Sequence, residues 1–252
     1  MSFKVYIPAR FGASRLPGKP LLQIAGKPMI QHVHERALES GADEVVIATD
    51  DERIAAAAAS FGAEVCMTAS THVSGTDRIA EAVRIRGEKK QTVIVNVQGD
   101  EPLMPSAVIR QVAEIVGDGK SVDIGTVCEP LPHATDFNDS NVVKVVRDAR
   151  NRALYFSRAP IPHDRDNTPY PQRDKALVRR HVGIYAYTVG YLQRFVALPP
   201  AALETTERLE QLRALVDGAC IMVPDAVAAC GMGVDTAADL ARLNQHWHQR
   251  KA

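Results

Sequence analysis

Residues 7–21 read IPARFGASRLPGKPL, in which a basic loop directly follows a short apolar run at residues 5–8. The loop carries three cations and a small hydroxyl: Arg10, Arg15, Lys19 and Ser14. Guanidinium groups bind phosphate oxygens in pairs, lysine adds a compact charge, and glycine lets backbone N–H groups approach a ligand closely. The loop is therefore a candidate triphosphate site at the end of a first strand. The alternative is an ordinary basic surface turn, in which proline and glycine are common.

Two familiar phosphate-binding motifs are missing from the sequence. The chain contains neither a G-x-x-x-x-G-K-[ST] loop nor a G-x-G-x-x-G fingerprint that opens a helix. The sequence therefore supports neither a Walker-type ATPase nor a simple dehydrogenase.

The first half of the chain alternates apolar, β-rich runs with segments of helical spacing. Strands are expected at residues 3–8, 45–48, 64–67 and 92–97, and helices at residues 28–39, 52–61 and 76–85. Such alternation predicts an α/β fold with a mostly parallel sheet and helices on both faces. Ligands of these sheets bind at the carboxyl ends of the strands, where the basic loop, Asp50 and Asp100 all fall.

The second half of the chain has a mixed pattern. Further strands are expected at residues 124–128, 142–146, 153–156 and 181–187. Residues 160–173 are polar and rich in proline, and they form a loop too long for a passive connection. Residues 204–216 predict a helix with Leu209, Leu212 and Val216 on one face.

Length and composition indicate one domain that spans residues 1–252, of which 46% are hydrophobic. Thirty Lys and Arg balance thirty Asp and Glu, so the basic loop is a local concentration of charge in a neutral protein. This pattern suits a small anionic ligand better than a nucleic acid. We expect no signal peptide, because the N-terminus has an early Lys4, three prolines by Pro20 and no apolar h-region of the required length. We expect no membrane span, because no apolar stretch approaches the length of about 18 residues that a span needs.

Cysteines and histidines could indicate disulfides or a metal site, and their spacing favours neither. The four cysteines are scattered and form no CxxC pair: Cys66, Cys128, Cys220 and Cys230. We expect free thiols in a reducing cytoplasm. The histidines at 32 and 34, and those at 246 and 248, form two pairs in expected helices. Residues two apart on a helix point in different directions, which favours a solvated surface over a metal site.

Two aspartates are candidate ligands for a divalent cation. Asp100 lies just beyond the apolar run VIVNV within VIVNVQGDEP, and Asp235 lies in GMGVDTAADL before an expected terminal helix. Mg²⁺ typically takes one or two protein carboxylates together with substrate phosphates. Both aspartates can equally serve as turn or helix-capping residues.

Nearly the whole sequence resembles the 3-deoxy-manno-octulosonate (Kdo) cytidylyltransferase family. The matching segments are, in order, IPARFGASRLPGKPL, IATDDERI, CMTASTHVSGTDRIAE, VNVQGDEPLMP, VVKVV, ALYFSRAPIPHDRD, RRHVGIYAY, LETTERLEQLRAL and GMGVDTAADL. The resemblance implies a Rossmann-like nucleotidyltransferase fold and a cytoplasmic homodimer. It also implies Mg²⁺-assisted in-line transfer of CMP from CTP to the anomeric hydroxyl of Kdo, for lipopolysaccharide synthesis.

The resemblance also implies roles for individual residues. Residues 1–120 would mainly bind CTP, and residues 121–252 would mainly bind the sugar and form the dimer. The implied nucleotide-binding residues are Pro8, Ala9, Arg10, Ser14, Arg15, Lys19, Ser74, Gly75 and Arg78. The implied sugar-binding residues are Gln98, Arg158, His181, Tyr185, Glu210 and Gln211. Arg15 and Lys19 would act in catalysis with Asp100 and Asp235, which would hold the metal.

Some residues leave alternatives open. His181 and Tyr185 share a strand face, so from the residues alone they fit a core position, and Glu210 fits a solvated helix surface. Phe11, Asp77 and His163 stand where the family commonly has tyrosine, glutamate and tryptophan. Another sugar-acid cytidylyltransferase, or a catalytically silent nucleotide-binding protein on the same fold, would carry a similar basic loop.

Overall fold

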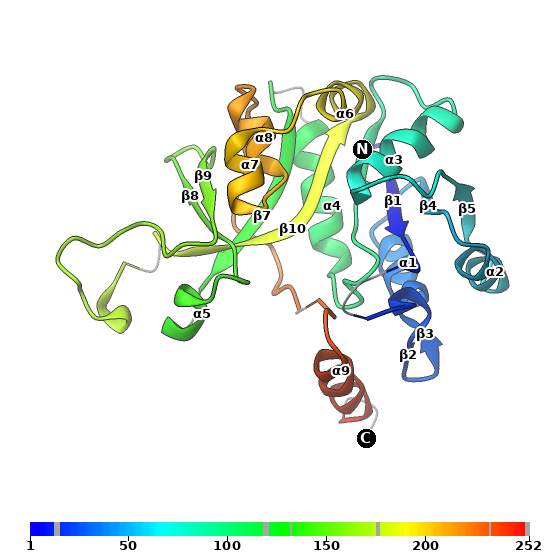
Figure 1. Cartoon of the computed structure of the whole chain (residues 1–252), viewed down its shortest axis with the longest axis horizontal. Helices are drawn as coiled ribbons and strands as arrows, with labels where there is room; N and C mark the ends of the chain where they lie inside the picture. The colour runs from blue at the N-terminus through cyan, green and yellow to red at the C-terminus, as the bar shows by residue number, and fades with distance from the viewer. Residues whose placement is uncertain (13–15, 118–120, 132, 175–176, 232, 250–252) are drawn as a thin grey trace.

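The computed structural model describes residues 1–12, 16–117, 121–131, 133–174, 177–231 and 233–249 of the chain (Figure 1). Within these residues no helix is long and apolar enough to cross a membrane. The segment around residues 160–174 extends away from the body of the molecule and contains only the short 3-10 helix η2 (Tyr170–Gln172), as the proline-rich sequence predicts (Figure 1). The four cysteines are free thiols, as expected.

A nine-stranded sheet forms the centre of the fold (Figure 1). Its parallel part consists of β1 (Lys4–Ala9), β4 (Glu44–Thr49), β5 (Glu64–Met67) and β6 (Val93–Asn96), with β1 between β4 and β6. Its mixed part consists of β7 (Ile124–Pro130), β8 (Lys144–Arg147), β9 (Ala153–Ser157), β10 (Arg179–Thr188) and β11 (Ile221–Met222). Strand β10 pairs antiparallel with β6, β7 and β8, and so joins the two parts. The predicted α/β fold, with a parallel first half and a mixed second half, is confirmed.

Helices cover both faces of this sheet, and its central strands are therefore buried on both sides. One face carries α1 (Met29–Glu39), α2 (Glu52–Ser60) and α4 (Ser106–Gly117), and the other carries α3 (Gly75–Ile85), α6 (Val189–Val196) and α8 (Gln211–Val216). Side chains of a strand alternate between faces. Val5 and Ile7 of β1 therefore join the first core, and Tyr6 between them joins the second.

The remaining elements are short or peripheral. They are η1 (Lys19–Leu21), β2 (Gln23–Ile24), β3 (Lys27–Pro28), α5 (Ala134–Asn138), α7 (Ala202–Glu207) and α9 (Ala237–Gln249). Helix α9 packs against the small β2–β3 sheet, where the side-chain oxygen of Asn244 accepts a hydrogen bond of 3.0 Å from the backbone N–H of Ala25. This contact places α9 beside β2, the strand that follows the basic loop.

The single helix expected over residues 204–216 is wrong. The segment forms two helices, α7 and α8, which are separated at Arg208, a residue with φ of 54°. Leu209 and Leu212 are buried as predicted, but Val216 is 60% exposed.

The solvated surface expected for the first histidine pair is also wrong. His32 and His34 are both buried on α1. A ring nitrogen of His32 lies 2.8 Å from the carbonyl oxygen of Ile24, and its ring lies 4.5 Å from that of Trp247. The rings of His32 and His34 are buried because α1 is covered on more than one side. The side chains of residues 246 and 248 lie outside the described part of the chain.

Candidate active site

A pocket lies at the carboxyl ends of β1 and β6, the location that the parallel sheet predicts. It contains nine of the expected site residues: Pro8, Ala9, Arg10, Lys19, Ser74, Gly75, Arg78, Gln98 and Asp100. The pocket is also lined by Pro20, His72, Val73 and Gly99. Ser14 and Arg15 lie outside the described residues.

Two glycines allow the segments around the pocket to approach β1. A Cβ atom at Gly75 would lie 3.0 Å from Cγ of Pro8, and one at Gly99 would lie 3.0 Å from the carbonyl oxygen of Pro8. Both distances are shorter than ordinary van der Waals contact, so a larger residue would push the walls of the pocket apart. Gly75 thereby keeps the start of α3 next to the end of β1, and Gly99 does the same for the segment that follows β6.

The N-terminus of α3 forms one wall of the pocket. Ser74 caps the helix, because its hydroxyl oxygen accepts a hydrogen bond of 3.1 Å from the backbone N–H of Asp77. The N-terminal end of a helix favours anionic groups. The hydroxyl of Thr76, in the same turn, donates a hydrogen bond of 2.6 Å to Glu210 at the start of α8. This bond joins the nucleotide side of the molecule to the expected sugar side.

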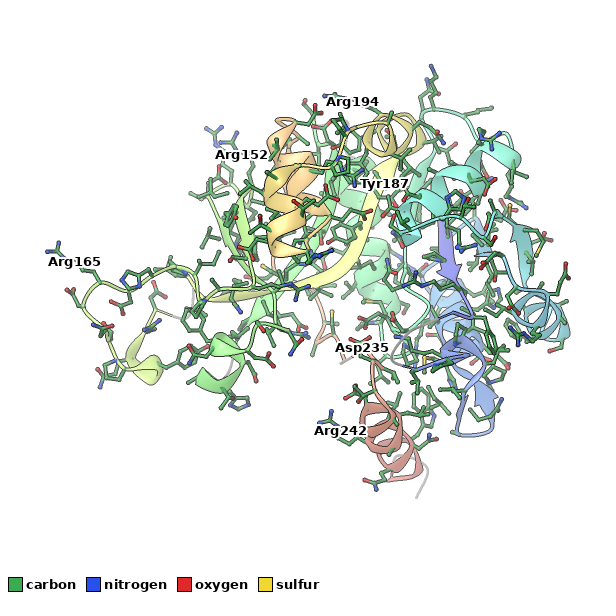
Figure 2. All side chains as sticks on the ribbon, viewed as in Figure 1. Arg152, Arg165, Tyr187, Arg194, Asp235 and Arg242 are labelled. Atoms are coloured by element: carbon green, nitrogen blue, oxygen red, sulfur yellow. The ribbon has the colours of Figure 1, made fainter. Side chains whose placement is uncertain are left out.

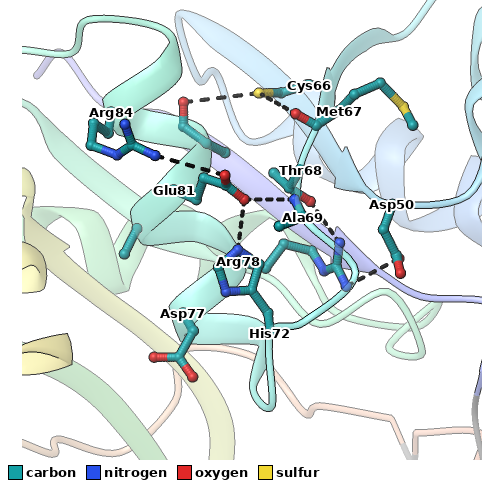
Figure 3. A network of polar contacts seen from close by, with 12 residues as sticks. Asp50, Cys66, Met67, Thr68, Ala69, His72, Asp77, Arg78, Glu81 and Arg84 are labelled. Carbon is teal, nitrogen blue, oxygen red and sulfur yellow. Dashed lines mark hydrogen bonds and ion pairs between the residues drawn. The ribbon is translucent and has the colours of Figure 1, made fainter.

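Arg78 is a buried cation held in a fixed position beside the pocket. Its guanidinium donates a hydrogen bond of 2.6 Å to the hydroxyl of Thr68 and forms an ion pair of 3.0 Å with Asp50 (Figure 3). Burial lowers the pKa of Arg78, although Asp50 opposes that effect. The sequence predicts Asp50 at a strand end but does not show which cation faces it.

Lys19 lies between the two candidate metal ligands. Its Nζ is 2.6 Å from Oδ2 of Asp100 and 3.1 Å from Oδ1 of Asp235. Burial alone would lower the pKa of Lys19, but the two carboxylates outweigh burial and raise that pKa. Asp235, which Figure 2 labels, is positioned next to Asp100 because the backbone N–H of Val234 donates a hydrogen bond of 3.0 Å to the carbonyl oxygen of Asp100.

This arrangement fits a divalent cation. Two carboxylates converge on one ammonium group, which occupies the position of a cation between them. Oxygen donors of this kind suit Mg²⁺. Among the described residues there is no cluster of three or more His, Cys, Asp or Glu side chains that could hold a metal. Two carboxylates would leave most ligand positions of such a cation to other oxygen donors.

The expected sugar-binding residues of β10 lie on the α3 and α8 side of the sheet. The rings of His181 and Tyr185 are 5.4 Å apart, and Nε2 of His181 is 3.0 Å from the hydroxyl oxygen of Thr126. Burial raises the pKa of Tyr185, and nearby Glu210 adds to the effect. Glu210 also has a raised pKa because of burial, although its bond from Thr76 opposes the rise.

Gln98 and Gln211 are the two glutamines among the expected sugar-binding residues. The amide nitrogen of Gln98 donates a hydrogen bond of 3.0 Å to the side-chain oxygen of Asn96, a residue of β6 that is only 1% exposed. Gln211 is buried in the first turn of α8. Asn96 was missed from the sequence because a polar residue inside an apolar strand gives no periodic signal.

Arg158 lies farther along the same side and organises backbone segments. Its guanidinium donates hydrogen bonds to the carbonyl oxygens of Glu207 at 2.7 Å, Ser140 at 2.9 Å and Arg208 at 3.3 Å. Its backbone N–H donates to the carboxylate of Glu207 at 2.9 Å. Arg158 thus fixes the turn between α7 and α8 that precedes Glu210.

The half-buried ring of His181 predicts a specific pH dependence of stability. Burial, assisted by the charge of Arg180, lowers the pKa of His181 to about 3. The unfolded chain then binds a proton at this site at higher pH than the native state does. The site's contribution to the free energy of unfolding should therefore fall as pH drops below about 6.5 and approaches 3.

Urea unfolding at pH 7.5 and pH 5 measures this effect in the wild type and in His181→Asn. We expect the variant to lose less stability between the two pH values than the wild type does. His32 and His34, whose pKa values are also lowered by burial, are present in both proteins and cancel in the comparison. Equal losses in the two proteins would contradict the assignment of a neutral imidazole at residue 181.

The fold and this site together define a nucleotide-binding enzyme of the nucleotidyltransferase class. Residues 5–221 match the family model described as Cytidylyltransferase. The chain is 54% identical to the 3-deoxy-manno-octulosonate cytidylyltransferase of Thioalkalivibrio sulfidiphilus over 97% of this chain and 98% of that protein. It is 53% identical to the enzyme of the same name from Cellvibrio japonicus over 96% and 97% of the two chains. The chain belongs to the 3-deoxy-manno-octulosonate cytidylyltransferase family.

Solved structures agree with this membership. A CMP:2-keto-3-deoxy-manno-octonic acid synthetase in complex with CTP superposes with a TM-score of 0.90 and 41% identity over 99% of this chain and 100% of that one. A nucleotidyl transferase from Methanothermobacter thermautotrophicus superposes with a TM-score of 0.65 at 15% identity over 99% of each chain, which shows a shared fold alone.

Proposed function

We propose that the protein transfers CMP from CTP to the anomeric hydroxyl of Kdo and releases pyrophosphate, with Mg²⁺ held by Asp100 and Asp235. The observation that carries the proposal is the convergence of these carboxylates and Lys19 beside the pocket at the strand ends. The names of the close relatives support both substrates. The product would supply activated Kdo for lipopolysaccharide synthesis in the cytoplasm.

Displacement at the α-phosphate requires charge neutralisation on the phosphate oxygens and in-line placement of the attacking hydroxyl. Arg10 and Lys19 line the pocket and supply positive charge from this chain. Arg15 and Ser14 would add their groups from the same loop. Mg²⁺ held by Asp100 and Asp235 would supply further positive charge for the phosphates and would lower the pKa of the attacking hydroxyl.

The base and ribose would bind where β1 meets α3. Pro8 and Ala9 offer backbone groups there, Ser74 and Gly75 offer the first turn of α3, and Arg78 offers a guanidinium whose position is fixed by Asp50. The side chains of Gln98, Tyr185, Glu210 and Gln211 would bind the hydroxyl groups of the sugar. The bond between Thr76 and Glu210 holds these two sides of the site together.

A pyrophosphate-release assay tests the proposed function. The purified protein is incubated with CTP and Mg²⁺ and with Kdo, an amino-substituted Kdo or a sialic acid. We expect release that depends on Kdo and that stops when Mg²⁺ is chelated. Release with a sialic acid but not with Kdo would assign the protein to another sugar-acid cytidylyltransferase. Binding of CTP without release for any sugar acid would identify a silent nucleotide-binding protein.

Replacement of Arg158 by Ala is expected to weaken Kdo binding and to leave CTP binding almost unchanged. A guanidinium matches a sugar carboxylate bidentately, and its removal also releases the turn before Glu210. We expect the KM for Kdo to rise on the order of tenfold or more, the usual scale for loss of a charge-assisted hydrogen bond.

Arg152→Ala is the matched control for this variant. Arg152 is an exposed arginine of the neighbouring hairpin, where it pairs with Asp148 at 2.7 Å (Figure 2). Calorimetry measures CTP binding first and then Kdo binding to the CTP-loaded protein. A CTP defect in Arg158→Ala as large as its Kdo defect would remove Arg158 from the sugar site.

We further propose that the protein works as a homodimer whose interface involves residues 121–252. Support comes from its resemblance to a family of dimeric enzymes. Sedimentation equilibrium of the full chain at several concentrations measures the mass of the assembly directly, and a monomer at micromolar concentration would contradict this part of the proposal.

A further inference from the structure

A hydrogen-bonded loop beside the pocket carries an inference about nucleotide binding. Residues 68–74 connect β5 to α3, and Ala69, Ser70 and Thr71 of this loop are exposed. Both ends of the loop are fixed. The backbone N–H of Thr68 donates a hydrogen bond of 2.9 Å to the carbonyl oxygen of Thr49, and the last residue of the loop caps α3.

Glu81, a residue of α3, binds the loop at two points. Its Oε2 accepts a hydrogen bond of 2.7 Å from the backbone N–H of Ala69 and lies 2.6 Å from Nε2 of His72 (Figure 3). One carboxylate oxygen therefore binds both the exposed start of the loop and a side chain near its end. Hydrogen bonds from His72 and from the backbone of Ala69 lower the pKa of Glu81, so the acceptor stays ionised at neutral pH.

The contact with Glu81 also fixes the ring of His72. A carboxylate can only accept, so Nε2 carries the proton that it donates, and Nδ1 is the ring nitrogen left for another partner. His72 itself lines the nucleotide pocket with Ser74, Gly75 and Arg78. Its neighbour Val73 is 84% exposed at the same place. The orientation of this pocket wall therefore depends on a residue outside the pocket.

We propose that Glu81 is a positioning residue for nucleotide binding, which acts by fixing the loop at residues 69–73 so that His72 forms a wall of the pocket. The inference rests on the proposed function, because it takes the pocket ligand to be CTP. Glu81 itself does not line the pocket. Its effect on the nucleotide is exerted through Ala69 and His72.

The test compares Glu81→Ala with Glu81→Gln and with a control. In Glu81→Ala we expect the KM and the calorimetric Kd for CTP to rise on the order of tenfold, the low end for loss of charge-assisted hydrogen bonds, while kcat and the KM for Kdo change less than about twofold. Glu81→Gln keeps an oxygen acceptor for both donors, so its Kd for CTP should return to within about threefold of the wild type.

Arg84→Ala is the matched control, because Arg84 contacts the other oxygen of Glu81 at 3.7 Å and is exposed (Figure 3). It should bind CTP like the wild type. A double-mutant cycle adds a second readout: if Glu81 acts through His72, then Glu81→Ala should cost less CTP affinity in a His72→Ala background than in the wild type. A cooperative thermal transition in each variant shows that the fold is intact.

The outcomes separate this inference from the proposed function. Wild-type affinity for CTP in Glu81→Ala, an equal loss in Arg84→Ala, or full additivity with His72→Ala would overturn the role of Glu81, whichever reaction the enzyme catalyses. CTP binding without pyrophosphate release in the wild type would overturn the proposed function and leave the calorimetric test of Glu81 valid.

Discussion

Replacement of Asp100 by Asn, or of Asp235 by Asn, is expected to abolish Mg²⁺-dependent pyrophosphate release and to leave the fold intact. An amide is a poor substitute for a carboxylate at a hard cation. Each substitution also removes one of the two charges that hold Lys19. We expect the rate at saturating CTP and Kdo to fall on the order of a thousandfold, since several kcal/mol of charge stabilisation depend on the metal.

The matched control is Asp217→Asn, which applies the same isosteric change to an aspartate paired with the exposed side chain of Arg194 (Figure 2). Loss of such a surface pair has little effect. The measurement is initial rate against Mg²⁺ concentration, together with the thermal midpoint of each protein. If either active-site variant follows the wild-type Mg²⁺ titration, its aspartate is not a metal ligand.

The order of elements and the place of the pocket could be predicted because they depend on short-range sequence patterns. Apolar runs interrupted by helical spacing give the parallel strands, and their carboxyl ends must meet at one edge of the sheet. Lys19 and Asp100 each follow a predicted strand, so their proximity follows from the fold class. Helix α4 could also have been found, because Val108, Ile109, Val112 and Val116 repeat at helical spacing.

The corrections arise where tertiary structure overrides a local pattern. The helical pattern of residues 204–216 is interrupted at Arg208, a non-glycine residue with positive φ that propensities do not reveal. His32 is buried because the carbonyl of Ile24 and the ring of Trp247 meet it from two other elements. Neither partner could be inferred from spacing within α1.

The site shows the same limit. Asp235 reaches Lys19 across 216 residues of sequence, and the backbone pairing of Val234 with Asp100 is one contact that brings it there. The motif containing His72 was recognised as a segment, but the bond from His72 to Glu81 requires the first turns of α3 to fold back beside the loop. Family resemblance supplied residue identities, and the structure supplied the contacts through which they act.

Replacement of Lys19 by Ala is expected to lower the catalytic rate and, at the same time, to strengthen Mg²⁺ binding in the absence of nucleotide. The ammonium of Lys19 lies between Asp100 and Asp235 and stays protonated, because the carboxylates raise its pKa despite burial. A metal ion must compete with this charge for the same oxygens. Without Lys19, no ammonium competes with the cation for these carboxylates, but the phosphates lose a positioned charge.

We expect kcat for Lys19→Ala to fall on the order of a hundredfold or more, the usual scale for loss of one preorganised electrostatic partner. Calorimetry should detect tighter Mg²⁺ binding by the nucleotide-free variant than by the wild type. Lys27→Ala is the matched control, since Lys27 is 46% exposed at its side chain and pairs with Glu35 on the surface. An unchanged kcat in Lys19→Ala would exclude Lys19 from phosphate binding. Because the two readouts move in opposite directions, a general loss of folding, which would weaken both, cannot imitate the expected result.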